Sequence, residues 1–304
     1  MSFEPSPTKR VSRRVSLTGG GDRLDRVIAQ ALPEVSRRAA RGLISEGAVF
    51  VDGRRCRVAS RAIPVGTPIV VHLPIATTGT LASPPLPVLY EDERIVVIDK
   101  PPGVHVHMTE SSVDRSIVEQ WPEPVFPVHR LDRGTSGVLL LAKDRALATQ
   151  LMEAFRARQV EKRYVAVVEG QLSDRTIDAP IGRDPRRPRL YSVRADGRRA
   201  VTTVRTSATI ENLSVVAVDL CTGRTHQIRV HLSSVGTPIL GDRAYGGRSH
   251  VRIGESIMEL KRPALHAARL RIGLPDGERT FVAPIPADLR ALDPAGLALE
   301  TAYA

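Results

Sequence analysis

The sequence is poor in aromatic residues, has only two cysteines and contains no apolar run long enough to cross a membrane. Aromatic residues make up 4% of its 304 residues, which disfavours a nucleic-acid surface built on many stacked rings. Cys56 and Cys221 lie far apart without CxxC spacing, so neither a zinc ribbon nor a redox pair nor a disulfide framework is indicated. Residues 1–16 lack the apolar core of a signal peptide. These absences predict a soluble, cytoplasmic protein that does not interact with membranes.

Positive charge is abundant, and almost all of it is arginine. The 44 Lys and Arg residues exceed the 33 Asp and Glu residues and give a net charge of +11, and only five of the 44 are lysine. Guanidinium groups bind phosphate in a planar, two-pronged geometry, so a nucleic acid is the natural partner for such a surface. A general preference for arginine over lysine across a proteome would give the same excess. Charge alone therefore favours nucleic acid without establishing it.

The first quarter of the chain is typical of a small helix-helix-hairpin unit at residues 17–75. Residues 1–16 mix proline, serine and basic residues without periodicity, which predicts a flexible basic tail. A first helix is expected from Leu24, with Asp22 as a candidate cap and Pro33 as its stop. Further expected elements are a helix from Ser36 to Gly47, strands at 49–51 and 54–58 around the Asp52-Gly53 turn, a strand at 69–73 and a linker at 76–87.

Residues 88–290 combine many strands with a few helices that do not alternate strictly. This pattern predicts an α+β fold with a mixed, largely antiparallel central sheet. Val138–Ala142 is an apolar run typical of a buried strand, and Asp144 is a candidate cap for the helix that follows. Residues 291–304 are expected to form a C-terminal tail. The other expected elements are strands at 88–90, 95–99, 163–168, 198–205 and 213–220 and a helix at 225–234.

A carboxylate, cations, hydroxyls and two glycines are concentrated in residues 128–137, directly before the buried strand. The glycines would allow backbone to approach a ligand, and Thr135 and Ser136 can fix the loop by hydrogen bonds. Neighbouring arginines favour the ionised form of Asp132, which can act as a nucleophile. An aspartate in such a turn can also do no more than bind backbone N–H groups. The full ten-residue pattern favours the catalytic interpretation over this one.

Two clusters of arginine are candidate phosphate contacts. The second helix places Arg37, Arg38 and Arg41 on its outer face. The stretch 183–199, punctuated by proline and glycine, contains seven arginines and a turn at Asp196-Gly197, which predicts a loop that grips nucleic acid. Its central candidates are Arg186, Arg187 and Arg189. Ordinary solvated loops carry similar runs of charge, so this alternative stays open.

The sequence gives no sign of a cofactor or a metal. There is no phosphate loop, no dinucleotide fingerprint and no cluster of metal ligands with usable spacing. His105 and His107 form an H-x-H pair, but the alternation of a strand places two such side chains on one face without any metal. We therefore expect a protein that binds neither.

Several segments together resemble a known enzyme family, the pseudouridine synthases that modify ribosomal and transfer RNA. They follow in the family's order across residues 86–285, and residues 22–73 separately resemble the small RNA-binding module of a ribosomal small-subunit protein. After Lys100-Pro101 the usual His-Pro pair is absent, which affects the expected shape of that loop only. The matching segments are His129–Asp132 with Thr135–Gly137, Arg163-Tyr164, Gly223–His231, Gly241-Asp242 with Tyr245-Gly246, and Leu265–Ala267.

The resemblance implies an isomerase that needs no cofactor and uses Asp132 as its nucleophile, against either the ribose C1′ or the base C6. It implies that Tyr164 stacks near the target base and takes the C5 proton. Arg229 would hold Asp132 in a bidentate ion pair, and Arg224 would order the same loop or contact phosphate. Because a base inside a stack is unreachable, the target nucleotide must be extruded, and Arg130 is the candidate that braces the vacated space.

We therefore expect a monomeric pseudouridine synthase fold preceded by a small RNA-binding domain, with RNA as its partner. Large-subunit ribosomal RNA is the favoured substrate, and transfer RNA is the alternative. A non-catalytic RNA-binding or ribosome-assembly factor is the chief rival from another class, but the complete set of Asp132, Tyr164 and Arg229 argues against it. A DNA-binding regulator would leave residues 88–285 unexplained.

Overall fold

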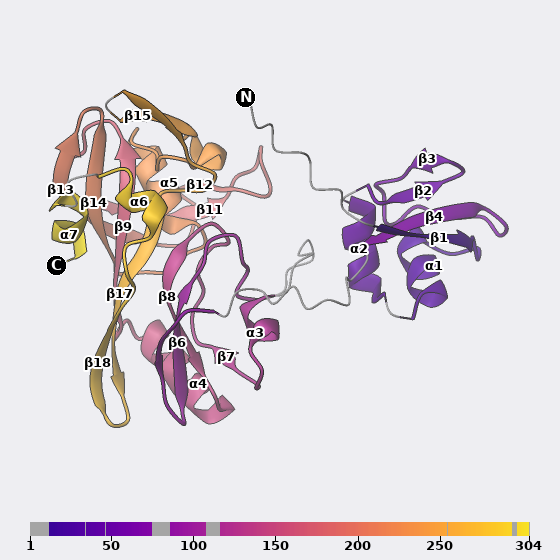
Figure 1. Cartoon of the computed structure of the whole chain (residues 1–304), viewed down its shortest axis with the longest axis horizontal. Helices are drawn as coiled ribbons and strands as arrows, with labels where there is room; N and C mark the ends of the chain where they lie inside the picture. The colour runs from indigo at the N-terminus through magenta and orange to yellow at the C-terminus, as the bar shows by residue number, and fades with distance from the viewer. Residues whose placement is uncertain are drawn as a thin grey trace, which may run out of the picture. The chain divides into compact units, whose positions relative to one another are not determined.

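The computed structural model divides the chain into two compact units (Figure 1), and each is considered by itself. The first comprises residues 1–84 and 108–115, and the second comprises residues 85–107 and 116–304. None of the helices in the part described is long and apolar enough to span a membrane. Residues 75–85, which include most of the predicted linker, lie outside the described residues. The structure describes residues 12–33, 35–45, 47–74, 86–107, 116–253, 255–293 and 297–303.

The first unit packs two helices on a four-stranded sheet of order β1-β4-β2-β3. Leu24, Ile28 and Ile44 from the helices are fully buried together with Val71 of the sheet. The turn between β2 and β3 has positive φ at Asp52 (50°) and Gly53 (71°), as predicted for this hairpin. The elements are β1 Ser12–Thr18, α1 Leu24–Ala31, α2 Arg37–Ser45, β2 Val49–Val51, β3 Arg54–Arg55 and β4 Pro68–Pro74.

Two local predictions for the first unit were wrong. Residues 12–16, predicted as tail, belong to β1, which pairs antiparallel with β4 along its full length. This long-range pairing supplies backbone hydrogen bonds that no local pattern reveals. Asp22 is not the cap of α1, because the cap position is Arg23 and Asp22 instead accepts the Arg23 N–H at 2.7 Å. Residues 1–11 of the predicted tail lie outside the described residues.

The second unit is organised around one large sheet of order β10-β13-β14-β9-β17-β8-β6-β5, to which β18 adds beside β17 and β7 beside β8. Among the described strands of this sheet only the β8–β17 pair is parallel, which confirms the predicted mixed, largely antiparallel sheet. The strands are β5 Val88–Glu91, β6 Ile95–Lys100, β7 Phe126–Pro127, β8 Ser136–Ala142, β9 Glu161–Glu169, β10 Arg175–Asp178, β13 Val201–Ile210, β14 Leu213–Leu220, β17 Leu265–Leu274 and β18 Gly277–Val282.

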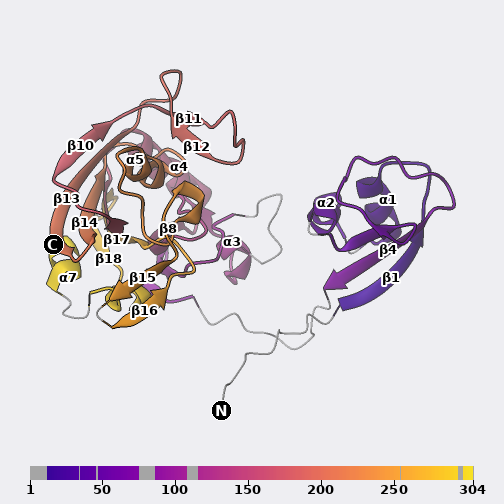
Figure 2. The ribbon, with the colours of Figure 1, turned by 90° about the horizontal axis from the view of Figure 1, so that it is seen from above.

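Helices and two small hairpins complete this unit. Helix α5 lies beside β12 and β13 (Figure 2), and the predicted cap of α4 is confirmed because Asp144 accepts the Leu147 N–H at 2.8 Å. The hairpins are β11 Ile181–Arg183 with β12 Tyr191–Val193, and β15 His250–Ile253 with β16 Ser256–Glu259. The helices are α3 Ile117–Gln120, α4 Arg145–Arg156, α5 Gln227–Ser234, η1 Arg243–Tyr245, α6 Ala287–Arg290 and α7 Leu297–Tyr303.

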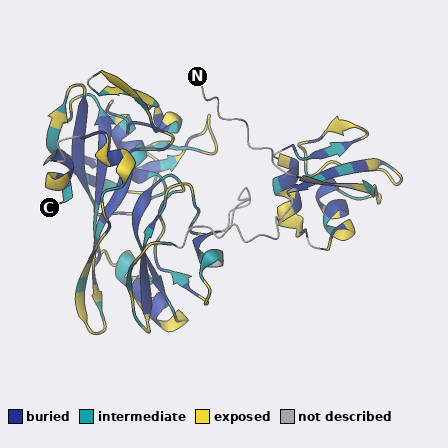
Figure 3. Ribbon diagram, in the orientation of Figure 1, coloured by how far each residue is buried: buried dark blue, intermediate teal, exposed yellow. Residues whose placement is uncertain are grey.

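Both faces of the large sheet are covered, and its strands β6, β8, β9, β14 and β17 are buried along most of their length, whereas β10 and β18 are largely exposed (Figure 3). In β6, Val96 and Ile98 join the core that also contains α7, whereas Ile95 and Val97 join the core beneath α4. The predicted C-terminal tail was therefore wrong in part. Residues 297–303 form α7, in which Leu299 and Ala302 are fully buried, because their apolar face packs on β13 and β14.

Candidate active site

Asp132 lies on the loop that leads into β8, a fully buried strand between β17 and β6 of the large sheet. Its side chain is 19% exposed, and its carbonyl accepts the N–H of Thr135 at 3.1 Å, which closes the turn. Gly137 follows with φ +113°, and a Cβ there would lie 2.2 Å from the Ala267 carbonyl oxygen of β17. The sequence analysis expected the glycines to let backbone approach a ligand, but at Gly137 the close neighbour is a strand. This close approach fixes the end of the Asp132 loop.

Lys100 ties the Asp132 loop to the loop that follows β6. Its side chain is fully buried, and Nζ donates to the carbonyls of Pro101 (2.8 Å), Val104 (2.9 Å) and Arg133 (3.4 Å). Burial lowers the pKa of Lys100 to about 7, an effect that the nearby Arg262 charge reinforces. In the sequence Lys100 stands only as part of a motif, and nothing there indicates that it anchors the Asp132 loop.

Arg229 on α5 lies between two carboxylates, with its side chain 12% exposed. Its Nη1 is 3.4 Å from Asp132 Oδ2, whereas Nε and Nη2 bind the two oxygens of Asp242 at 2.6 and 2.8 Å. The predicted contact with Asp132 exists, but the bidentate partner is Asp242. The reason is geometric, since Asp242 is nearly fully buried and faces the forked side of the guanidinium, while Asp132 meets one corner. Asp242 was missed as a site residue, although it stood in a quoted motif.

Tyr164 comes from the middle of the sheet, where β9 pairs with both β14 and β17. The residue is only 8% exposed. Burial raises the pKa of its hydroxyl, and the Asp132 charge raises it further. The neutral phenol is therefore the form present at neutral pH. The two roles expected for Tyr164, stacking near the base and removal of the C5 proton, stay predictions.

His226 was also missed, and it reaches the same carboxylate as Arg229. Its Nε2 lies 3.9 Å from Asp132 Oδ2, and its Nδ1 is hydrogen-bonded to the Tyr245 hydroxyl at 2.7 Å. The Tyr245 ring in turn lies under Arg229, with 4.8 Å between the guanidinium carbon and the ring centroid. Tyr245 therefore contacts both side chains that face Oδ2 of Asp132.

Three other motif residues make no hydrogen bond or ion pair with Asp132. Arg130 is exposed and makes no ion pair with any residue in the described part of the chain. Arg224 donates through Nε to the Arg199 carbonyl at 3.0 Å, so it orders the segment before β13 and not the Asp132 loop. His129 is structural: it accepts the Leu140 N–H at 3.0 Å and stacks on Phe155, and burial lowers its pKa to about 3.

The three central candidates of the predicted gripping loop, Arg186, Arg187 and Arg189, are exposed between β11 and β12. Asp184 accepts the backbone N–H groups of Arg186 (2.9 Å) and Arg187 (3.1 Å), and its second oxygen binds the Arg187 side chain at 3.2 Å. The side chains of Arg186 and Arg189 have no partner among the residues that the structure describes. Asp184 therefore fixes the backbone of this loop, and the guanidinium groups of Arg186 and Arg189 extend into solvent.

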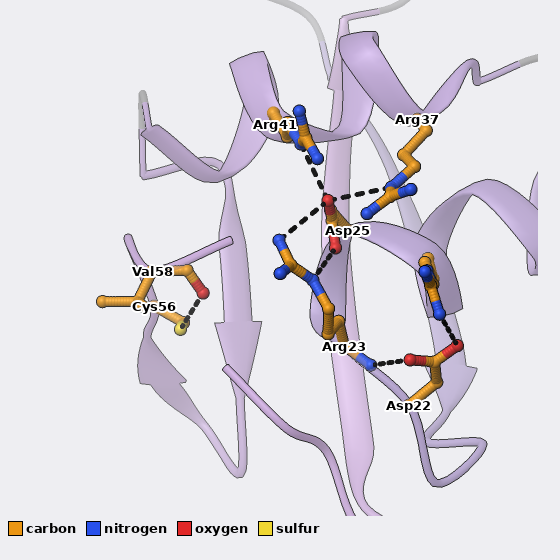
Figure 4. Close-up of polar contacts among 8 residues, drawn as sticks. Asp22, Arg23, Asp25, Arg37, Arg41, Cys56 and Val58 are labelled. Atoms are coloured by element: carbon orange, nitrogen blue, oxygen red, sulfur yellow. Dashed lines mark hydrogen bonds and ion pairs between the residues drawn. The ribbon is translucent and has the colours of Figure 1, made fainter. Parts of the chain in front are cut away.

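In the first unit a single buried carboxylate binds three arginines (Figure 4). Asp25 of α1 has no exposed surface, and it binds Arg41 at 2.7 Å and both Arg23 and Arg37 at 3.1 Å. Burial would raise the pKa of Asp25, but the hydrogen bonds from these arginines outweigh it and lower the pKa. The three guanidinium groups are each about 40% exposed, so the cluster offers excess positive charge at the surface. Arg38 is exposed beside them.

Among the described residues no group of three potential metal ligands comes together. A pocket is lined by Arg229 and Asp242. Arg243, Lys261 and Arg262 line it as well, so its basic side chains outnumber the acidic Asp242 and Glu259. The fold and the site together define a class of protein: an enzyme with a carboxylate held by arginine beside a basic cleft, joined to a small basic unit.

Comparisons with known proteins identify the family. The model of the family described as RNA pseudouridylate synthase matches residues 94–234, and that of the S4 domain matches residues 22–69. Ribosomal large subunit pseudouridine synthase D of Xanthomonas campestris pv. campestris is 38% identical over 96% of this chain and 94% of its own. The enzyme of the same name from Pseudomonas aeruginosa is 36% identical, covering 88% of this chain and 90% of its own.

Solved structures agree with this assignment. Human RNA pseudouridylate synthase domain containing 4 has a TM-score of 0.56 and 28% identity, covering 68% of this chain and 92% of its own. The chain belongs to the RNA pseudouridylate synthase family, and it is an isomerase that acts on RNA. The resemblance and the fold class inferred from the sequence are thereby confirmed.

Proposed function

We propose that the protein converts uridine to pseudouridine in large-subunit ribosomal RNA, with Asp132 as the nucleophile. The observation that carries the proposal is the carboxylate of Asp132, partly exposed at the end of a buried strand and 3.4 Å from Arg229. The names of the relatives, which specify the ribosomal large subunit, support the choice of substrate. A monomer as the active unit is part of this proposal.

The reaction is an isomerisation, so atoms and electrons balance within the nucleoside. The bond between N1 and the ribose C1′ breaks, a bond between C5 and C1′ forms, and one proton is lost from C5 while N1 gains one. Asp132 supplies an electron pair either to C1′, expelling uracil with the N1 pair, or to C6, moving the C5–C6 π pair onto the base. In both routes the bond to Asp132 later breaks and its pair returns to the carboxylate.

Arg229 contacts the Asp132 carboxylate and orients it for this attack, and Asp242 holds Arg229. Tyr164 presents a neutral ring on which the extruded base stacks. Arg130, exposed two positions before Asp132, braces the space from which the nucleotide is removed.

RNA is held by two basic surfaces that contact phosphate. One is the Asp25 cluster of Arg23, Arg37 and Arg41 with the adjacent Arg38, and the other is the β11–β12 loop with Arg186, Arg187 and Arg189. In the first, buried Asp25 fixes the guanidinium groups in advance, which reduces the entropy lost on binding phosphate. Arg224 orders the segment before β13 through its hydrogen bond to the Arg199 carbonyl.

The nucleophile is tested by Asp132→Asn, with Asp276→Asn in the exposed β17–β18 turn as a matched control. Ribosomal and transfer RNA from cells lacking the gene are incubated with each variant, and pseudouridine is mapped by a chemical adduct that stops reverse transcription. We expect Asp132→Asn to lose about 10³-fold or more in turnover while RNA affinity is kept. Turnover near wild type would refute the nucleophile, and binding of RNA by the wild-type protein without any adduct would favour a non-catalytic factor. Adducts only in transfer RNA would refute the ribosomal substrate.

The basic loop is tested by replacing three arginines with alanine and measuring RNA affinity at several salt concentrations. Loss of phosphate contacts should weaken binding and flatten the dependence of affinity on salt. The test variant changes Arg186, Arg187 and Arg189, and the control variant changes the exposed Arg156, Arg252 and Arg290. If the two variants show the same dependence of affinity on salt, the loop is an ordinary solvated surface.

Higher affinity of the wild-type protein for duplex DNA than for folded RNA at matched salt would favour a DNA-binding regulator.

A further inference from the structure

His226 occupies an unusual backbone position directly beside Asp132. It is the cap residue at the start of α5, and its φ of 57° lies in the left-handed region, which few residues other than glycine adopt. The side chain of His226 makes no capping hydrogen bond to the helix. Strained backbone of this kind persists where the surroundings fix it, and it is concentrated at functional sites. Here the imidazole is packed edge-on against the rings of Tyr191 and Tyr245.

The contact with Tyr245 favours one of the two neutral tautomers of His226. The Tyr245 hydroxyl oxygen accepts the backbone N–H of Tyr191 at 3.1 Å, and we assign the hydroxyl's own hydrogen to the 2.7 Å contact with Nδ1 of His226. A neutral imidazole that accepts at Nδ1 has its hydrogen on Nε2. Burial of His226 lowers its pKa, which favours this neutral form. The Nε2–H group is the one that faces Asp132.

Both donors near Asp132 face the same oxygen. Arg229 Nη1 lies 3.4 Å and His226 Nε2 lies 3.9 Å from Oδ2. Oδ1 has no donor partner among the described residues. Catalytic hydrogen bonds are often long in the free enzyme and shorten when substrate binds. Oδ1 is thus the oxygen left to attack, while Oδ2 is held.

We propose that His226, with its tautomer set by Tyr245, is a positioning residue that donates from Nε2 to Oδ2 of Asp132 and leaves Oδ1 to attack the nucleoside. This inference rests on the proposed role of Asp132 as nucleophile. Protonation of His226 would convert the weak donor into a full cation beside Oδ2. The carboxylate would then be held more tightly, and its electron pair would be less available for attack.

The pH dependence of turnover is therefore expected to have an acid limb set by His226. The charged groups that face the imidazole are Asp132 and Asp242, which raise its pKa, and Arg229 and Arg130, which lower it. Tyr245 stays neutral, because burial raises the pKa of its hydroxyl. A falling pH thus protonates Nδ1 of His226, so the Tyr245 hydroxyl changes from donor to acceptor in this contact, and turnover should fall with unchanged RNA affinity.

The test compares substitutions at two positions by their kcat, KM and pH profiles on ribosomal RNA. The amide nitrogen of glutamine in His226→Gln reaches the place of Nε2, so this variant should keep kcat within about fivefold but lose the acid limb. His226→Asn tolerates the left-handed backbone better but cannot reach Oδ2, and Tyr245→Phe removes only the hydroxyl. Both should lower kcat by about 10–100-fold with KM within about twofold, because a small misplacement of a reacting group has effects of this size. The exposed His250→Gln is the matched control and should behave as wild type.

The outcomes separate this inference from the proposed function. Turnover by Asp132→Asn would refute the nucleophile itself. If Asp132→Asn is inactive but Tyr245→Phe and His226→Asn match the wild type, only the positioning role is refuted. A purely structural role for His226 would make Asn better than Gln and leave the acid limb in place, and that result would also overturn the inference. If Tyr245→Phe fails to fold, the kcat values and pH profiles of His226→Gln and His226→Asn still test the positioning role of His226.

Discussion

Replacing Asp242 by asparagine would remove the charge that holds Arg229 in place while keeping the size of the side chain. Asp242 is 2% exposed and binds Arg229 through two short contacts, 2.6 and 2.8 Å. The asparagine retains one oxygen acceptor for the guanidinium but presents an amide donor to its second nitrogen. Arg229 is then free to turn toward Asp132, its other carboxylate neighbour.

The size of the effect follows from burial. Breaking one side of a buried ion pair costs about 3–5 kcal/mol, and the remaining acceptor offsets about 1–2 kcal/mol of this. A net loss of about 1–4 kcal/mol lowers the Tm of a unit of this size by about 2–16 °C. Because a reoriented Arg229 no longer presents Asp132 correctly, kcat should also fall by about tenfold or more.

Calorimetry of the full chain and the adduct assay on ribosomal RNA measure the two effects separately. Asp276→Asn, an exposed site, controls for the substitution. A drop in Tm with unchanged kcat would mean that Asp242 only stabilises the fold. An unchanged Tm would refute the reasoning altogether, because removing the charge of a buried carboxylate that accepts two hydrogen bonds from Arg229 must cost stability.

Three other perturbations probe separate parts of the structure. The pKa of Lys100 falls from 10.5 to about 7 on folding, so the unfolded chain binds more protons between these values and stability should rise with pH across that window. Lys100→Met should flatten this rise, as followed by urea unfolding with the fluorescence of the single Trp121; an equal slope would contradict it. Leu299→Ala should cost about 2–4 kcal/mol in thermal unfolding, because the side chain is fully buried, and wild-type stability would mean that α7 is not packed. Asp25→Asn should speed hydrogen exchange in α1 and α2, since three guanidinium groups lose their shared anion; unchanged exchange would count against the cluster.

Strong local patterns were enough to predict much of the fold. The strand at Leu213–Leu220 has the bounds that its apolar run indicated, and the capped helix after Asp144 is present. The failures occur where distant contacts decide. Residues 12–16 become a strand only because β4 lies alongside, and α7 is short enough that its helical face is recognised only against the sheet.

The sequence by itself determined the family and the Asp132 motif, because residue types crowded within a few positions need no knowledge of distant partners. Only the tertiary structure decided which carboxylate takes the two-pronged contact of Arg229, and it is Asp242. It also decided that Tyr245 and His226 meet beside Asp132, 94 residues earlier in the chain than His226. Such choices depend on distances of a few tenths of an ångström between side chains from different elements, and spacing along the chain does not contain that information.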